Sequence, residues 1–257
     1  MTIRLDTSAA NLISMSDAVL VDMDGCMIAS GQALPGAAEL ISLCGEKLWL
    51  VSNNSSHSAA ELSRYLESLG LSIPARRVLL AGELVLSKLQ QQFPSMPAMI
   101  LARKELRQYA TEKGITESDS SPGVVVLTRD LDLSYHRLSL AIKHLSRGVP
   151  LLVANPDLSH PDLDGDPVPE TGSLLALLLA AVPDLQYQVF GKPEPGLFLA
   201  ALEQSGALAE NSLMIGDNPR TDCDGAALLG IRPLLIGKDK NALAKDIEAL
   251  LSTRIIT

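Results

Sequence analysis

The apolar run Ala18–Val21 ends in two carboxylates, Asp22 and Asp24, and Gly25 follows at once. The run has the length of a buried parallel strand, and a glycine there is a turn signal that ends it. Because side chains alternate along a strand, both acids would project from the same side where it ends. Like charges so close repel one another unless a cation or a shared proton compensates. Ligands of open parallel α/β sheets bind at the carboxyl ends of strands, so the pattern predicts a hard divalent cation, Mg²⁺, at this point. Taken alone, the segment could also be a solvated turn.

A second apolar run, residues 48–51, ends in hydroxyl and amide side chains: Ser52, Asn53 and Asn54. Hydroxyls and backbone N–H groups at a strand end, ahead of a helix, suit a phosphate group. The alternative is an ordinary Ser/Asn turn that caps a helix near residues 59–69.

Two later segments add charges of both signs. Lys192 stands between Gly191 and Pro193 after a strand-like segment, where a fixed ammonium could neutralise phosphate charge. A further apolar strand near 213–215 leads to Asp217, and Asp222 follows five residues later. Each segment alone could be a turn lysine or a helix cap, but together the four strand ends favour a phosphate site with a metal.

In this order the four segments resemble the haloacid dehalogenase-like hydrolase superfamily. Its signature is Asp-x-Asp-Gly on the first strand, Ser or Thr after the second, then Lys, then Gly-Asp-x-x-x-x-Asp. Here these are 22–25, Ser52, Lys192 and 216–222. The Ser/Asn run at 52–56 and the long gap after Ser52 resemble the NagD-like branch, which includes p-nitrophenyl phosphatases.

The resemblance implies a role for each residue of the signature. It makes Asp22 the nucleophile that forms an aspartyl phosphate and Asp24 the general acid and base. Mg²⁺ would be held by Asp22, by the backbone carbonyl of Asp24 and by Asp217, with Asp222 in a supporting or metal-binding place. Lys192 would offset charge on the transferring group.

The resemblance also implies phosphate-binding groups next to the second strand. The Ser52 hydroxyl and the Asn53 N–H would hold phosphate oxygens, and Asn54 follows them directly as a further candidate. The substrate expected from all these groups is a small phosphorylated metabolite.

Composition restricts the other partners and the compartment. The formal net charge of −9 argues against nucleic acid or an anionic membrane, since both need basic patches. The three cysteines form no CxxC motif, which fits a reducing cytosol, so we expect a cytoplasmic enzyme. Cys26 and Cys223 each lie beside a signature segment and are either two small buried residues or an oxidation-sensitive pair.

Strand-like runs alternate with helical stretches, which predicts an α/β fold with a doubly wound, Rossmann-like parallel sheet. The expected core strands are 18–21, 48–51, 77–80, 188–190, 213–215 and 233–236. Residues 82–182 carry their own α/β pattern, with strands near 98–101, 123–127 and 151–154. We therefore expect a core of residues 1–81 and 183–257 and a large inserted domain, by resemblance a C2-type cap, at 82–182.

The acidic segment 162–166 lacks the spacing of a calcium loop and is expected to be a polar loop.

The cap is expected to select the substrate. Its candidate contacts follow cap strands: Arg129, Asn155 and Asp157. Asn-Pro-Asp is also good turn chemistry, so a structural role for Asn155 and Asp157 is the alternative. The resemblance further suggests a homodimer formed through the cap.

Three other activities compete with a phosphatase. A haloacid dehalogenase would use the first aspartate on carbon but needs neither Asp24 nor Asp217. A phosphomutase would keep all of these residues and return the phosphoryl group to its substrate. A non-catalytic phosphometabolite-binding protein would need neither the nucleophile nor its acid/base.

Overall fold

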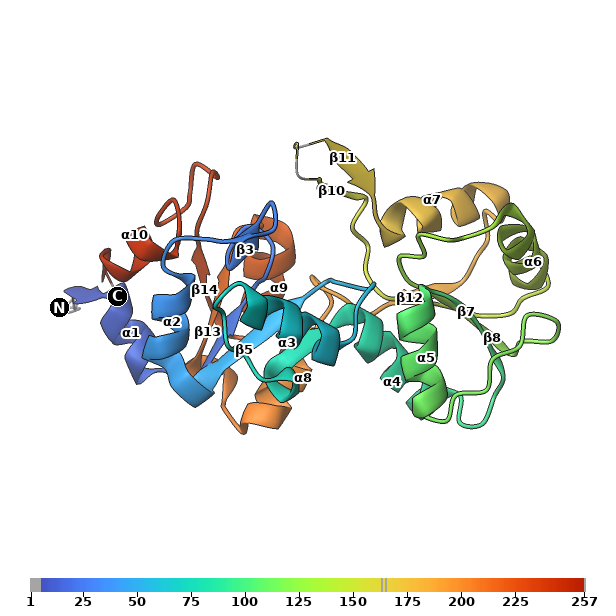
Figure 1. Ribbon diagram of the computed structural model, residues 1–257, viewed down its shortest axis with the longest axis horizontal. Coiled ribbons are helices and arrows are strands. Elements are labelled where there is room, and N and C mark those ends of the chain that lie inside the picture. Colours follow the sequence, from blue (N-terminus) through green and yellow to red (C-terminus); the bar gives the residue numbers. More distant parts are fainter. Residues whose placement is uncertain (1–5, 163, 165, 257) are drawn as a thin grey trace. The chain divides into compact units, whose positions relative to one another are not determined.

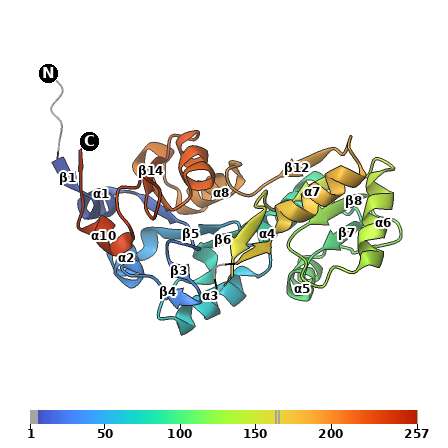
Figure 2. The ribbon, with the colours of Figure 1, turned by 90° about the horizontal axis from the view of Figure 1, so that it is seen from above.

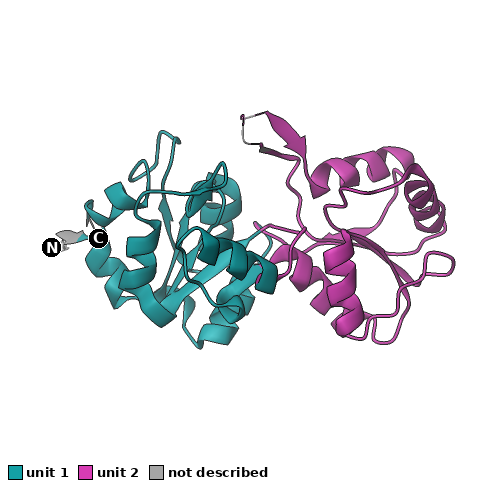
Figure 3. Ribbon diagram, viewed as in Figure 1, with its two compact units in different colours: residues 1–52, 60–79, 193–257 teal, residues 53–59, 80–192 magenta. Residues whose placement is uncertain are grey.

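The computed structural model describes residues 6–162, 164 and 166–256, and within it the chain forms two compact units (Figure 3). Unit 1 comprises the described residues of 1–52, 60–79 and 193–257. Unit 2 comprises those of 53–59 and 80–192. The insertion expected at 82–182 falls inside unit 2.

Unit 1 is built on a five-stranded sheet in the order β14-β13-β2-β5-β6. The pairings of β13 with β14, of β13 with β2 and of β2 with β5 are parallel. Every residue of β2, β5 and β13 is buried, as expected for strands covered on both faces. The strands are β2 (Ala18–Val21), β5 (Leu48–Ser52), β6 (Val78–Leu80), β13 (Ser212–Gly216) and β14 (Arg232–Leu235).

The order of these strands makes the sheet doubly wound. From β2 the chain moves to β5 and β6, whereas β13 and β14 lie on the other side of β2, so the direction changes between β2 and β13. Figures 1 and 2 show α2 and α8 on opposite faces of this sheet. The predicted fold class is confirmed. The helices are α1 (Ala9–Met15), α2 (Ala37–Cys44), α3 (Ala59–Ser68), α8 (Gly196–Ser205), α9 (Gly225–Ala227) and α10 (Ile247–Leu251).

Unit 2 has its own four-stranded parallel sheet, in the order β12-β9-β8-β7. One face carries α6 and α7, whose Ala141, Leu145, Leu175 and Leu178 are buried in the same core cluster as Val125. Helix α4 contacts β8 and β9, and the two views show α4 and α5 on the other face (Figures 1 and 2). The elements are β7 (Ala98–Leu101), β8 (Val124–Leu127), β9 (Leu151–Val153), β12 (Tyr187–Val189), α4 (Ala81–Gln92), α5 (Lys104–Glu112), α6 (Tyr135–Leu145) and α7 (Thr171–Ala181).

One strand expected in the core sheet belongs to the other unit. The segment predicted at 188–190 does form β12, but β12 pairs with β9, with Gln188 opposite Leu152. The prediction of a core strand there was wrong because a short strand at the edge of either sheet has the same apolar pattern. The chain leaves unit 2 only after Lys192.

Short strands complete the fold. In unit 2 the hairpin β10 (Ser159–Pro161) and β11 (Pro167–Pro169) is antiparallel. At its tip Asp162 Oδ1 accepts hydrogen bonds from the backbone N–H groups of Asp164 and Asp166, as expected for a polar loop, while residues 163 and 165 lie outside the described residues. Unit 1 adds two antiparallel pairs, β1 (Asp6–Ser8) with β15 (Arg254–Ile256) and β3 (Ile28–Ala29) with β4 (Gln32–Ala33). Within the described ranges, no helix has the length and apolar character needed to cross a membrane.

Candidate active site

Two carboxylates emerge side by side at the point where the strand order of unit 1 reverses. Asp22 follows β2 directly and Asp217 follows β13 directly, and the last paired residues of these strands are Val21 and Ile215. The backbone N–H of Asp22 donates to the Ile215 carbonyl at 2.9 Å, so the pairing reaches as far as the acid itself. Such a switch point is the place where open α/β sheets bind ligands.

A third ligand-type atom lies with these two acids. The Sγ of Cys26 and one carboxylate oxygen each of Asp22 and Asp217 lie within 4.8 Å of one another. Asp22 and Cys26 are buried, whereas Asp217 is half-buried. The sequence motifs did not predict Cys26 as a metal ligand. The available signal was its position directly after Asp-x-Asp-Gly, four residues from Asp22.

A tight turn after β2 places Asp24 and Cys26. The Gly25 N–H donates to the Ile28 carbonyl at 2.9 Å, and the Met27 N–H donates to the Met23 carbonyl at 2.9 Å. Gly25 has φ +82°, which a side chain would disfavour. Asp24 lies on the exposed side of this turn, where its carboxyl group can exchange protons with solvent.

Asp222 supports the loop that carries Asp217. It is buried in the π-helical turn η4 (Pro219–Asp224), and its Oδ2 accepts a hydrogen bond from the Asn218 N–H at 3.1 Å. A Cβ atom at Gly216 would lie 2.3 Å from the Asp222 Cβ, so a glycine is needed where this side chain packs against β13. Its carboxylate therefore accepts a hydrogen bond from the backbone beside Asp217.

Ser52 and its neighbours are divided between the units. Ser52 is the buried last residue of β5 in unit 1, and β5 pairs directly with β2. Asn53 and Asn54 begin unit 2. The Oδ1 of Asn54 accepts hydrogen bonds from the N–H groups of Ser56 and His57, so this side chain forms the turn that precedes α3.

Unit 2 brings several predicted residues together around Asn53. Its Nδ2 donates to the Lys192 carbonyl and to Asp157 Oδ2, both at 2.9 Å. Its carbonyl accepts from the Asn155 Nδ2 at 2.7 Å. The first and last segments of unit 2 are thereby fastened to each other and to the turn that follows β9, and Lys192 is buried.

The contacts of Asn155 favour its structural alternative. It is buried, and its amide nitrogen lies within hydrogen-bonding distance of Ser55 Oγ and Thr171 Oγ1 as well as the Asn53 carbonyl. These bonds connect three segments of unit 2. A group so engaged is placed to hold the fold rather than to read a leaving group.

Arg129 belongs to a polar cluster with Glu170 and His160. Its Nη1 lies 3.4 Å from Glu170 Oε1, and His160 Nδ1 lies 2.8 Å from the same oxygen. Burial, and then the charge of Arg129, lower the pKa of His160 below its usual value. At neutral pH the cluster therefore pairs one cation with one anion beside an uncharged imidazole.

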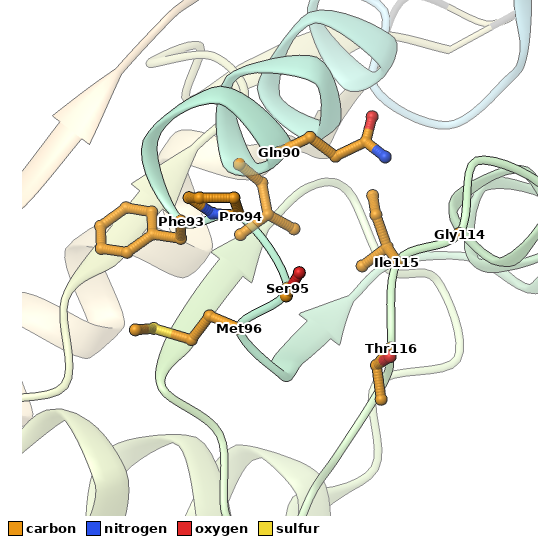
Figure 4. A pocket seen from close by; sticks show the side chains of 9 residues that line it. Gln90, Phe93, Pro94, Ser95, Met96, Gly114, Ile115 and Thr116 are labelled. Carbon is orange, nitrogen blue, oxygen red and sulfur yellow. The ribbon is translucent and has the colours of Figure 1, made fainter.

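A separate pocket in unit 2 has the wrong chemistry for phosphate transfer. It has a volume of about 240 Å³ and lies at the end of α4, bounded by Phe93, Met96 and Ile115 (Figure 4). Its polar side chains are Gln90, Ser95 and Thr116, and its lining includes no carboxylate, imidazole or cationic group.

Comparisons with known proteins agree with the geometry. The sequence model of the haloacid dehalogenase-like hydrolases matches residues 19–116, and a related HAD-hydrolase-like model matches residues 189–252. Dihydroxyacetone phosphatase of Corynebacterium glutamicum is 29% identical over 232 residues, covering 89% of this chain and 82% of that protein. Chronophin of Mus musculus is 31% identical over 227 residues, covering 82% and 77%. The crystal structure of 4-nitrophenylphosphatase from Thermotoga maritima matches with a TM-score of 0.86 at 26% identity, covering 94% and 98%.

A further structural relative was solved with bound metals. The glycerol phosphate phosphatase of Mycobacterium tuberculosis is 26% identical and was crystallised in complex with magnesium and with calcium. The match to its magnesium complex has a TM-score of 0.82 and covers 91% of this chain and 70% of that one.

The matches to the family models and to these relatives show that the chain belongs to the haloacid dehalogenase-like hydrolase superfamily, and its doubly wound sheet with paired strand-end carboxylates is consistent with this. Within that superfamily it is a phosphoric monoester hydrolase that resembles the NagD and p-nitrophenyl phosphatase branch, as its motifs predict. By their names, two of these relatives act on small phosphorylated compounds, and one of the two was crystallised with divalent cations.

Proposed function

We propose that the chain hydrolyses small phosphate monoesters with Mg²⁺, through an aspartyl phosphate formed on Asp22. The observation that carries the proposal is the meeting of Asp22 and Asp217 at the switch point between β2 and β13. Two carboxylates this close favour a bound cation, because otherwise their charges repel.

The residues present fit Mg²⁺. It prefers oxygen ligands and is commonly bound through one or two carboxylates, with water and phosphate completing the shell. Asp22 and Asp217 supply those carboxylates, and we assign the backbone carbonyl of Asp24 as a third ligand from the motif. When bound, the cation offsets the negative charge of the phosphoryl group.

Asp22 and Asp24 carry the chemistry in this proposal. A carboxylate oxygen of Asp22 forms a bond to phosphorus while the bond from phosphorus to the ester oxygen breaks. Asp24 donates its proton to the departing alkoxide. A water molecule then attacks phosphorus, gives a proton back to Asp24 and releases Asp22 with inorganic phosphate.

Other residues are assigned from the motif. The Ser52 hydroxyl and the Asn53 N–H would hold phosphate oxygens, and the Lys192 ammonium would offset developing charge. The hydrogen bond from Asn53 to the Lys192 carbonyl supports the assignment of the lysine, because it fixes the backbone from which that side chain extends. Homodimerisation through the insertion and a cytoplasmic location stay predictions.

The polar cluster of Arg129, Glu170 and His160 in unit 2 suggests which class of leaving group the enzyme accepts. If this unit reads the leaving group, as the resemblance implies, Arg129 does so with its charge offset by Glu170. Such a cluster favours uncharged hydroxyl or carbonyl compounds over esters that carry a second acid. The names of two relatives, which act on dihydroxyacetone phosphate and glycerol phosphate, point in the same direction.

A phosphate-release screen tests the proposal. The panel should pair neutral polyol esters with esters that carry a carboxylate, and each should be measured with and without Mg²⁺. We expect phosphate release that needs Mg²⁺, is lost in Asp22→Asn and is faster with the neutral esters. Conversion of a phosphorylated substrate to an isomer without phosphate release would instead identify a phosphomutase.

A further inference from the structure

Cys26 is the thiol that the structure places among the candidate metal ligands. Its Sγ and oxygens of both Asp22 and Asp217 lie within 4.8 Å of one another, and its side chain is buried. Cys44 lies at the end of α2 and Cys223 in η4, and neither joins a metal-ligand group among the residues that the structure describes.

Sulfur changes which cations such a site prefers. Mg²⁺ and Ca²⁺ take oxygen ligands, so a thiol adds nothing for them. Zn²⁺ and Cd²⁺ accept thiolate together with carboxylate. We propose that Cys26, Asp22 and Asp217 form a three-ligand site for a thiophilic cation, which competes with Mg²⁺ and blocks the nucleophile.

The spacing of the three groups fits such a cation. Zinc bonds of about 2.3 Å to sulfur and about 2.0 Å to oxygen place tetrahedral ligand atoms about 3.5 Å apart. The observed limit of 4.8 Å therefore requires only small side-chain movements. Three protein ligands would leave one position of a tetrahedral zinc ion for water or phosphate.

The surrounding backbone fixes two of the three ligands in advance. Cys26 lies in the turn whose hydrogen bonds join Gly25 to Ile28 and Met27 to Met23. Asp217 lies against that turn, since a Cβ at Gly25 would fall 2.1 Å from its Oδ2. A relative with the same fold binds divalent cations in crystals, which is independent support for a cation in this enzyme. Binding would displace the thiol proton to solvent as the sulfur–metal bond forms.

The inference rests on the proposed function for the identity of the metal ligands, but its test needs no turnover. Metal-free enzyme is titrated with Cd²⁺ while the sulfur-to-metal charge-transfer absorption is recorded, and Zn²⁺ affinity is measured by competition with a chromogenic chelator. The wild type is compared with Cys26→Ser and Cys26→Ala. The matched control is a Cys44→Ala, Cys223→Ala double variant, which retains Cys26.

In the wild type and in the double variant, we expect the charge-transfer band to saturate at one equivalent of Cd²⁺. Neither Cys26 variant should show the band. Zn²⁺ affinity should fall at least about 10-fold in the Cys26 variants, since even partners outside the ligand set cost that much in other sites. A band that persists without Cys26, or equal Zn²⁺ affinity in folded wild type and variants, would overturn the inference. Absence of Mg²⁺-dependent hydrolysis in the wild type would instead count against the proposed function. The Cd²⁺ band would still test whether Cys26 binds the metal, because it needs no turnover.

Discussion

The carboxylate of Asp217 lies directly over the backbone of Gly25: a Cβ atom at position 25 would sit 2.1 Å from Asp217 Oδ2. The glycine after the Asp-x-Asp pair thus has two tasks. It adopts a φ of +82°, and it leaves room for the acid that follows the neighbouring strand. This contact ties the turn after β2 to the residue after β13.

Gly25→Ala should impair metal binding more than its effect on stability explains. Gly70 is the matched control, because its φ is +81° and nothing lies within 4 Å of the position that its Cβ would take. Both variants should pay about 1–2 kcal/mol for the left-handed backbone. Only Gly25→Ala should also displace Asp217 and weaken Mg²⁺ binding, at least about 10-fold. Denaturant titrations and Mg²⁺ titrations measure the two effects, and equal Mg²⁺ affinity in both variants would refute the argument.

Removal of the metal should stop hydrolysis. EDTA should abolish phosphate release and Mg²⁺ should restore it, while Ca²⁺ should not support turnover, because its larger and looser shell misplaces the nucleophile. Asp217→Asn should raise the Mg²⁺ concentration that is needed for half-maximal rate. The exposed Asp224→Asn variant serves as the control. Full activity in exhaustively chelated enzyme would contradict the metal assignment.

Asn155→Ala should act on stability and not on substrate choice. The change leaves the Asn53 carbonyl without its Asn155 amide donor inside unit 2, a cost of about 1–3 kcal/mol. The ranking of esters by kcat/KM should stay the same, and Asn241→Ala, at an exposed position, should change neither property. A re-ordered substrate panel with unchanged stability would show that Asn155 contacts the leaving group.

Asp130 should make stability depend on pH. Burial raises the pKa of this carboxyl above its usual value, so the folded state favours the protonated form. That stabilisation is complete below the pKa of the unfolded state and is lost as the pH rises through the folded pKa. Asp130→Asn keeps an acceptor for the Asp132 N–H and cannot ionise. The free energy of unfolding of Asp130→Asn, relative to wild type, should therefore increase from acidic to neutral pH. Denaturant melts across that pH range measure this difference. The exposed Asp184→Asn variant is the control and should show no such increase. A difference in stability between Asp130→Asn and wild type that does not change with pH would contradict the raised pKa of Asp130.

The sequence predicted the strands that carry the chemistry because each is a continuous apolar run that ends in polar residues. It placed β12 in the wrong sheet, since three residues at a sheet edge carry no signal of their neighbour. Cys26 was not predicted as a ligand because its nearness to Asp217 depends on the pairing of β2 with β13, two strands that lie far apart in the sequence. The hydrogen bonds of Asn155 depend likewise on the approach of the segment that carries Asn53 and Ser55, which lies far from Asn155 in the sequence.

The central claim is that Asp22 carries the phosphoryl group during turnover. The most direct measurement is an acid quench during steady-state hydrolysis, followed by borohydride reduction, proteolysis and mass spectrometry of the peptide that contains residue 22. An aspartyl phosphate is reduced to homoserine, so the account predicts homoserine at position 22 in substrate-treated wild type and none in Asp22→Asn. With p-nitrophenyl phosphate, whose leaving group needs no proton, Asp24→Asn should still form the intermediate but lacks the base for the second step, so it should accumulate more of it. Rapid turnover with Asp22 unmodified, or a phosphoryl group trapped on another residue, would contradict the mechanism.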